Sequence, residues 1–426
     1  MTFIIFPGMI FFYLLLMWKA GKTYPVLYLF FFTFFLQYIF STHIIYSEFA
    51  QLRKEMPIGQ DQLFEYAIPA LLALFAGVFF FNKDLNVADL FKLVDSRRAV
   101  RLGYLLLLIS YSLDFLRDAG VGWISSITSF TTYIKYAAVF CFLFQTSWRH
   151  YLVIVFVYLQ LAVTVLRGGV FIDFLVWSTF LFFFVCLKFR IPFWLRLGFI
   201  FIAAPVLILI QNTKSDYRQE TWKKNKEGGI SLFSEIAGKK SERDEDLPFS
   251  KSEGVMRTVA RLNQGWHLGL TLRQVPRKQA FANGAEMASD VVSAVIPRLV
   301  FPEKKSVHTN EKFRKYTGHK LPKNTSMTIG ILGDFYVNFG RWSSLIALFI
   351  FGAVIARLLY FFQVRYVLPD PVNIIWVPFL LNFLIRADND FYIMFNCILK
   401  GFVIFLFVRF LERRIWPQQQ VRPLIQ

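Results

Sequence analysis

Cysteine and histidine are scarce in this sequence. Three cysteines and five histidines occur among 426 residues. Cys141, Cys186 and Cys397 lie far apart, each inside an apolar run, so the sequence offers neither a disulfide framework nor a Cys-x-x-Cys metal pair. We therefore expect the cysteines to be packing residues and predict no metal site.

Charged residues are sparse as well, and apolar side chains dominate the composition. Asp, Glu, Lys and Arg together make up 18% of the chain, whereas hydrophobic residues make up 56% and include 52 Phe. This balance excludes an ordinary soluble domain and is typical of a polytopic membrane protein. The apolar run 1–18 lacks a basic leader and an Ala-x-Ala cleavage site, so it predicts a first spanning helix rather than a signal peptide.

Long apolar runs recur along the chain. A spanning helix needs about 20 mostly apolar residues, and the runs that meet this need lie at 1–18, 25–46, 64–81, 102–118, 124–145, 151–166, 170–187, 193–212, 342–362, 372–386 and 391–411. The sequence thus predicts an all-α polytopic membrane protein with about 11 transmembrane helices.

Basic residues in the short loops predict an orientation, because Lys and Arg are retained on the cytoplasmic side. One set of alternate loops, together with the C-terminal tail, holds seventeen Lys and Arg, whereas the other set holds five. This bias predicts an external N-terminus and a cytoplasmic C-terminus. The chain then divides into helices one to eight in 1–212, an external, periplasmic segment in 213–341, helices nine to eleven in 342–411 and a cytoplasmic tail in 412–426.

The external segment 213–341 is far longer than a connection requires. Its first part, 213–254, mixes charges of both signs with little periodicity, and we expect it to be exposed and mobile. The second part, 255–341, shows helical periodicity and predicts a lid of two amphipathic helices over the outer surface of the bundle. Their apolar faces are formed by Val255, Val259, Leu262, Trp266 and Leu270, and by Met287, Val291, Val295 and Leu299.

The positive charge of this segment has two explanations. Residues 213–340 contain 22 Lys and Arg against 14 Asp and Glu. The retention of basic residues on the cytoplasmic side applies to short loops, and long external domains escape it. The segment is either a solvated basic domain, or some of its cations hold a phosphate-bearing ligand. Nucleic acid does not fit an external loop of this kind, whereas an anionic lipid-linked substrate at the outer leaflet does.

Further charged residues lie at the outer ends of predicted helices or inside them. Arg167, which precedes two glycines, either snorkels to lipid headgroups or faces a ligand. The string "LIRADND", residues 384–390, forms either a salt-bridged turn or part of the same site. Three ionisable residues within the apolar runs are expected to face the interior, with a structural ion pair as the alternative for Asp173; they are Lys135, Asp173 and Lys400.

Two strings late in the external segment favour a particular chemistry. The string "IPRLVFPEKK", residues 296–305, combines two prolines with Arg298 and Lys304. The string "TSMTIGILGDFYVNFGRW", residues 325–342, places Asp334 and Asn338 one turn apart on a helical face. A carboxylate near phosphate-binding cations is a candidate general base for a sugar hydroxyl.

These two strings are similar to segments of the Wzy-type O-antigen and oligosaccharide repeat-unit polymerases. That family has a proline–arginine–proline–lysine segment, followed by a segment with glycine, acid, tyrosine and asparagine–phenylalanine–glycine. The topology, with one large periplasmic loop late in the chain, resembles the family over the whole length, and "LRGG" at Arg167 is a weaker third match. The resemblance implies a GT-C-like enzyme of the bacterial inner membrane.

Enzymes of this family transfer a growing glycan from undecaprenyl diphosphate to the non-reducing sugar of another lipid-linked repeat unit. The resemblance implies undecaprenyl-diphosphate-linked oligosaccharide, membrane lipids and a chain-length regulator as partners, with no nucleotide sugar, metal or cofactor. Transfer needs positive charge for the diphosphate and a base for the acceptor hydroxyl. Asp334 is the preferred base and His308 the second choice, although a lone histidine in a polar loop is more often merely exposed. The candidates for binding diphosphate are Arg167, Arg257, Arg261, Arg298, Lys304 and Arg386.

Four other functions compete with this one. An O-antigen ligase shares the topology and the donor, and differs in its acceptor, the lipid A core. A polysaccharide flippase or transporter would show internal repeats and broken helices in both halves. An exosortase-like peptidase would need a cysteine at the outer surface, and a purely structural scaffold would need no site.

Overall fold

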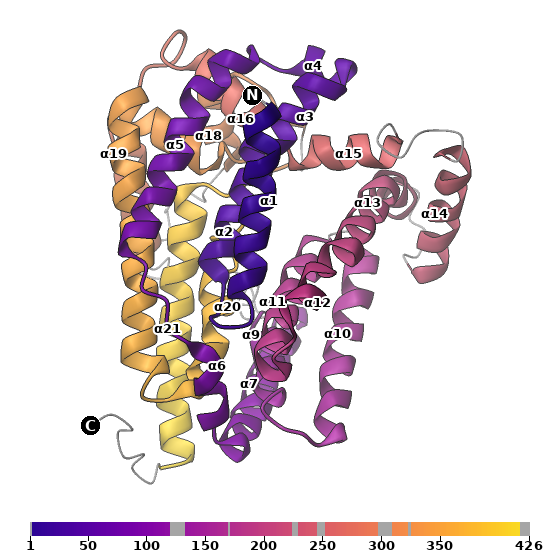
Figure 1. Cartoon of the computed structure of the whole chain (residues 1–426), viewed down its shortest axis with the longest axis vertical. Helices are drawn as coiled ribbons and strands as arrows, with labels where there is room; N and C mark the ends of the chain where they lie inside the picture. The colour runs from indigo at the N-terminus through magenta and orange to yellow at the C-terminus, as the bar shows by residue number, and fades with distance from the viewer. Residues whose placement is uncertain are drawn as a thin grey trace.

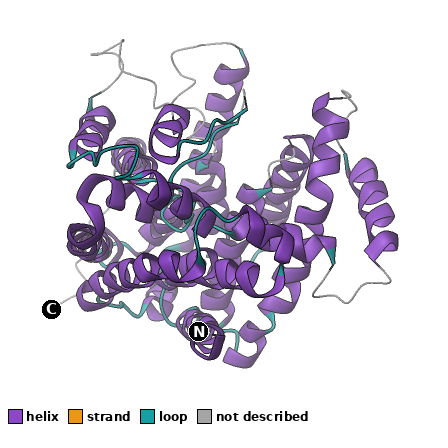
Figure 2. Ribbon diagram, turned by 90° about the horizontal axis from the view of Figure 1, so that it is seen from above, coloured by secondary structure: helices purple, strands orange, loops and turns teal. Residues whose placement is uncertain are grey.

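The computed structural model describes most of the chain, and every element in the described part is a helix (Figure 1 and Figure 2). The described residues are 2–119, 133–168, 171–223, 229–244, 252–296, 309–322 and 325–417. Within them, nine helices are long and apolar enough to cross a membrane. The prediction of an all-α polytopic membrane protein is therefore confirmed.

The nine candidate spans agree with nine of the predicted apolar runs. They are Thr2–Lys19, Val26–Glu48, Gln60–Phe81, Ser96–Asp118, Trp148–Arg167, Ile172–Phe189, Phe193–Thr221, Gly330–Val367 and Phe391–Ile415. The ends differ most in the seventh and eighth spans, which extend into the segment that the sequence predicted to be an external loop.

One of the eleven predicted spans does not have the predicted form, because the run 372–386 is helical only over Pro371–Leu381 and continues as turns. Another cannot be compared over its whole length, since residues 124–132 of the run 124–145 lie outside the described residues. The described remainder of that run contains α9 (Ile134–Phe142).

The helices fall into three groups along the chain. The first group comprises α1 (Thr2–Lys19), α2 (Val26–Phe34), α3 (Ser41–Glu48), α4 (Ala50–Glu55), α5 (Gln60–Phe81), α6 (Val87–Leu90), α7 (Ser96–Asp118), α9, α10 (Trp148–Gly168), α11 (Ile172–Phe189), α12 (Phe193–Leu197) and α13 (Phe199–Arg218). The middle group comprises α14 (Ile230–Asp244), α15 (Glu253–Leu262), α16 (Gly265–Gln274), α17 (Ala285–Val295) and α18 (Thr309–Thr317). The last group comprises α19 (Gly330–Phe362), α20 (Trp376–Leu381) and α21 (Phe391–Ile415).

Helices α15, α16 and α18 of the middle group lie at one end of the bundle, together with α3, α4 and the start of α1, whereas the last turns of α21 lie at the opposite end (Figure 1). The segment 213–254, which we expected to be mobile, contains the end of α13 and all of α14 where it is described. The predicted amphipathic helix from Val255 to Leu270 is two helices, because α15 ends at Leu262 and α16 begins at Gly265.

Helix α19 is broken near its start. Gly340 has φ 73° and ψ −171°, so the chain leaves the helical conformation there and resumes it at once. Such a positive φ suits glycine, which has no side chain to clash with the backbone. The part after the break matches the predicted span 342–362, and the part before it carries Asp334 and Asn338 to the end of the bundle where the middle helices lie.

Helices α5 and α19 pack backbone to backbone. A Cβ atom on Gly77 would collide with the carbonyl oxygen of Phe349, and one on Gly352 would collide with the carbonyl oxygen of Leu74. Small residues allow this close approach, which is the usual way for helices to associate where lipid removes the hydrophobic driving force. The two glycines therefore hold α19, and with it the polar end of the bundle, against α5.

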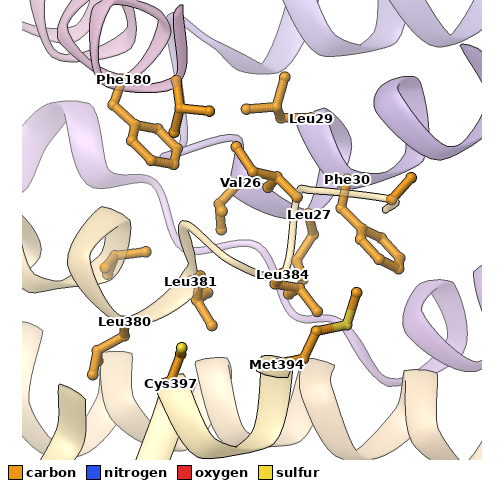
Figure 3. Close-up of a cluster of buried hydrophobic side chains, with 14 of the residues drawn as sticks. Val26, Leu27, Leu29, Phe30, Phe180, Leu380, Leu381, Leu384, Met394 and Cys397 are labelled. Atoms are coloured by element: carbon orange, nitrogen blue, oxygen red, sulfur yellow. The ribbon is translucent and has the colours of Figure 1, made fainter. Parts of the chain in front are cut away.

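The interior of the bundle is filled by aromatic and aliphatic side chains. Figure 3 shows side chains of α2, α11, α20 and α21 meeting in one cluster, which includes Phe30, Phe180, Leu381 and Cys397. All three cysteines are buried and free, in agreement with the prediction that they are packing residues.

Candidate functional site

A buried polar turn joins α20 to α21. Over residues 382–390, the peptide groups leave the helical pattern, so their carbonyls need other donors in a place that water does not reach. Side chains supply them. The hydroxyls of Thr33 and Tyr38 donate to the carbonyls of Ile385 and Ala387 at 2.9 and 3.1 Å, the amide of Asn389 donates to Phe383 at 2.7 Å, and the hydroxyl of Thr328 donates to Asp388.

One lysine and three aspartates form a cluster beside this polar turn. The ammonium of Lys312 on α18 lies 2.9 Å from a carboxylate oxygen of Asp290 on α17 and 3.0 Å from both carboxylate oxygens of Asp334 on α19. Asp390, the last residue of the polar turn, lies 3.9 Å away. We call these four residues the lysine–carboxylate cluster.

Burial differs among the three carboxylates of this cluster. The Asp334 and Asp390 side chains are 0% and 1% exposed, whereas the Asp290 side chain is 13% exposed and the Lys312 side chain 11%. One cation faces three carboxylates, so the cluster carries a net negative charge when all are ionised. Asp290 is the carboxylate that solvent or a ligand reaches most easily.

The electrostatics of the cluster follow from its burial. Burial raises the pKa of Asp290, Lys312 opposes the rise and the carboxylates of Asp334 and Asp390 add to it, so that the pKa is about 6. Burial likewise raises the pKa of Asp390. Burial alone would lower the pKa of Lys312, but the three carboxylates raise it well above its ordinary value. Lys312 therefore stays charged near neutral pH, and Asp290 titrates close to physiological pH.

Asp334 is held from several sides. Its carboxylate accepts hydrogen bonds from the amide of Asn338 at 3.2 Å and from the backbone N–H of Phe391 at 3.1 Å, in addition to Lys312. Asn338 in turn accepts from the backbone N–H of Met287 at 3.2 Å. Asp334 thus ties α19, α18 and the start of α21 together, and Asn338 adds α17.

A second set of contacts joins α17 to α18 one turn away. Glu286 lies four residues before Asp290 and accepts hydrogen bonds from the Lys315 ammonium at 2.7 Å and from the Tyr316 hydroxyl at 2.8 Å. Although burial alone would raise the pKa of Glu286, these two donors lower it. Acidic residues of α17 therefore face basic residues of α18 along their shared contact.

The polar turn also contacts the other half of the bundle. The guanidinium of Arg386 lies 2.7 Å from the carboxylate of Asp173 on α11, and the hydroxyl of Tyr133 donates to the same carboxylate at 3.3 Å. Asp173 is thus a member of an ion pair, and its partner is Arg386 of the polar turn rather than Arg167. Nearby, Lys135 pairs with Asp114 at 3.1 Å, and Arg117 pairs with Asp114 at 3.3 Å.

Three cations meet where the end of α13 approaches α15. Lys214 and Arg218 lie four residues apart on α13, and α13 packs against α15, which carries Arg261. Like charges at this spacing repel each other unless an anion lies between them. We call Lys214, Arg218 and Arg261 the cation group.

Aromatic and histidine side chains lie beside the cation group. Trp266 and His319 are in edge-to-face contact with ring centroids 5.4 Å apart, and His267 contacts Phe313 in the same way at 5.8 Å. Burial lowers the pKa of His267, and the charges of Arg261 and His319 add to the fall, so that the pKa is about 4. His267 is therefore neutral at physiological pH and accepts or donates hydrogen bonds as a neutral group.

The residues predicted from the sequence lie in different places. Asp334 belongs to the lysine–carboxylate cluster, Arg386 to the polar turn and Arg261 to the cation group. Arg257 is occupied by Glu253 and Ser215, and Arg167 is exposed at the end of α10. Three further predicted residues lie outside the described residues; they are Arg298, Lys304 and His308.

Several residues of the site were not among the predicted ones. Lys312, Asp290, Lys214 and Arg218 entered the sequence analysis only as part of a count of charges. The spacing of Glu286 and Asp290, and of Lys312 and Lys315, was a usable signal, since helices whose acidic and basic residues repeat at three or four positions can pair along one face.

No cluster of His, Cys, Asp and Glu side chains in the described part of the chain is arranged to hold a metal ion. In the lysine–carboxylate cluster, the position between the carboxylates is taken by the Lys312 ammonium. Comparisons with protein-family models, with curated proteins and with solved structures give no significant match for this chain.

Proposed function

We propose that the protein is a membrane glycosyltransferase that uses a polyprenyl-diphosphate-linked glycan donor, and that it acts as an O-antigen or exopolysaccharide polymerase of the Wzy type. One observation carries the proposal. The polar turn holds a cation and a carboxylate in one short segment, because it carries Arg386 and, four residues later, Asp390, which lies 3.9 Å from the Lys312 ammonium. Such a transfer needs these two kinds of group side by side.

The cation group suits the diphosphate. Arg261 can present two parallel N–H donors to phosphate oxygens, and Lys214 adds a point charge. When the glycosidic carbon–oxygen bond to the donor breaks, negative charge develops on the departing diphosphate. Cations that already face this position stabilise the charge without reorganisation, which lowers the barrier to transfer.

Asp290 suits the acceptor better than Asp334 does. The acceptor hydroxyl attacks the anomeric carbon and must lose its proton to a base. Asp334 is wholly buried and is held by Lys312, Asn338 and the N–H of Phe391, whereas Asp290 is the more accessible carboxylate and has a pKa of about 6. We therefore assign the base to Asp290 and a positioning role to Asp334 and Lys312.

The proposal requires the end of the bundle with the lysine–carboxylate cluster to face the periplasm across the bacterial inner membrane. Labelling of introduced cysteines tests this orientation with little background, because Cys141, Cys186 and Cys397 are all buried. In intact cells, an impermeant thiol reagent should label Ser231→Cys and should not label Arg413→Cys. The reverse pattern contradicts the proposal.

Deletion of the gene tests the activity, with surface glycans analysed on gels. A polymerase leaves single capped repeat units in place of the polymer ladder. Loss of all capping instead indicates an O-antigen ligase, whose acceptor is the lipid A core. Unchanged glycans exclude both transferases.

A polysaccharide flippase is the second candidate, and the polar turn favours it. Transporters often use discontinuous helices whose irregular backbone lines a substrate site, and the segment from Pro371 to Asp390 is such an interrupted span. Accumulation of lipid-linked repeat units on the cytoplasmic side after deletion indicates a flippase, whereas accumulation on the periplasmic side indicates a polymerase.

A further inference from the structure

A groove lies on the outer surface of the bundle between α5 and α19, at the end of α5 far from the lysine–carboxylate cluster. Its volume is about 450 Å³, within the range of roughly 300–1,000 Å³ that is usual for small-molecule sites. The walls are formed largely by apolar side chains, among them Phe81, Phe349, Val354 and Phe361, and Arg357 lies at the rim.

The groove faces lipid. Ile350, Val354, Leu358 and Phe361 follow one face of α19 and are 48–55% exposed in the isolated chain. These residues belong to the candidate span Gly330–Val367. Because the hydrocarbon core contains no water, an apolar hollow on this face is filled by a hydrocarbon chain.

Arg357 lines the groove, and Lys83 contacts the ring of Tyr360, which follows Arg357 by three residues on α19. The guanidinium of Arg357 is 5.4 Å from the ring centroid of Phe81, the last residue of α5, and the ammonium of Lys83 is 5.4 Å from the ring centroid of Tyr360. Both side chains are exposed. The nearest acidic residue in sequence, Asp84, is paired with Lys19. The two cations are therefore available to a negatively charged headgroup.

We propose that this groove binds an anionic glycerophospholipid, with one acyl chain between α5 and α19 and the headgroup phosphate between Arg357 and Lys83. The charge selects the headgroup and the apolar walls select the chain. This site is separate from the proposed transferase site, since Asp334 lies about six helical turns from Arg357 along α19. The inference therefore stands or fails independently of the proposed function.

Native mass spectrometry of the full-length protein, released from nanodiscs of phosphatidylglycerol and phosphatidylcholine in equal amounts, tests the inference. The wild type should retain phosphatidylglycerol in preference to phosphatidylcholine. Arg357→Gln should retain about five-fold less of it, the loss that removal of one cation near an anionic lipid gives. Arg365→Gln is the matched control, because Arg365 is also exposed at this end of α19 and lies outside the groove.

Val354→Trp provides a second, uncharged test. The indole closes the groove on an exposed helix face while both cations remain, so it should reduce retention as strongly as Arg357→Gln does, with an unchanged melting temperature. The proposal is overturned if the wild type retains the two lipids equally. It is also overturned if Arg357→Gln retains as much phosphatidylglycerol as the wild type. Preferential retention of an added polyprenyl phosphate over phosphatidylglycerol also overturns it, because the site would then belong to another class of lipid.

Discussion

Lys312 and Asp290 lie 2.9 Å apart on neighbouring helices, although 22 residues separate them in the chain. Both side chains are nearly buried. The Lys312 ammonium also contacts Asp334 and faces Asp390. The pair therefore fixes the position of α17 and α18 relative to α19 and α21. The accessible carboxylate of the site depends on this single cation for its charge balance.

Replacement of Lys312 by methionine should destabilise the protein strongly. The substitution keeps the side-chain length but leaves three carboxylates without their cation, and removal of one partner of a buried ion pair costs about 3–5 kcal/mol. The melting temperature of the purified protein in detergent measures this loss. Lys315→Met is the matched control, since the Lys315 side chain is 47% exposed in its pair with Glu286 and such a pair contributes about 0–1 kcal/mol. Equal melting temperatures for the two variants contradict the assigned role of Lys312.

Asp290 should give the transfer reaction a dependence on pH near 6. Its pKa is raised from 3.8 to about 6, so the carboxylate is the free base above this pH and is protonated below it. Glycan transfer in proteoliposomes should therefore fall as the pH is lowered through about 6. Asp290→Asn should reduce the rate about 100-fold or more at pH 7.5. The rate that remains should not fall as the pH is lowered through about 6. In Glu286→Gln, one turn away on α17, the rate should still fall as the pH is lowered through about 6.

The stability that Asp290 contributes has the opposite dependence on pH. A carboxyl group whose pKa is higher in the folded than in the unfolded state favours folding when it is protonated. Its contribution is complete below the unfolded pKa, near 3.8, and is lost as the pH rises through about 6. The change in melting temperature between pH 5 and pH 7 should therefore be smaller in Asp290→Asn than in the wild type. A larger change in the variant excludes a raised pKa for Asp290.

Arg261 should contribute to donor affinity. Replacement by glutamine removes one charge-assisted contact from the cation group, and loss of such a contact raises the apparent KM for the lipid diphosphate about ten-fold. Arg257→Gln is a suitable control on the same helix, because Arg257 is already paired with Glu253. Initial rates at varied donor concentration separate KM from kcat. If the two variants have the same KM, the diphosphate does not bind at the cation group.

The sequence predicted the helical membrane fold because an apolar run of about 20 residues has few alternatives in a bilayer. The run 372–386 shows the limit of this reasoning. Its helix ends at Leu381, and the hydroxyls of Thr33, Tyr38 and Thr328 supply hydrogen bonds to the carbonyls of Ile385, Ala387 and Asp388 beyond this point. These donors come from distant parts of the chain, so no local pattern identifies them.

The site could be predicted only in part, for a similar reason. Asp334 was identified because glycines and polar residues surround it in an otherwise apolar segment. Lys312 was not, because its importance comes from three carboxylates on α17, α19 and the polar turn. Arg386 was identified as a cation near the outer end of a helix, but its pairing with Asp173 on α11 could not be anticipated from spacing along the sequence.

The close contact between α5 and α19 provides the last prediction. Gly352→Ala places a methyl group against the carbonyl oxygen of Leu74, and because that atom belongs to the backbone, the two helices must separate. Overpacking of this kind costs about 1–3 kcal/mol, so the melting temperature should fall. In Gly238→Ala, the new methyl group meets nothing within 4 Å, and alanine is the better helix former in the middle of α14. That control should melt at or above the wild-type temperature. If Gly352→Ala and Gly238→Ala have the same melting temperature, the backbone contact between α5 and α19 does not hold the bundle together.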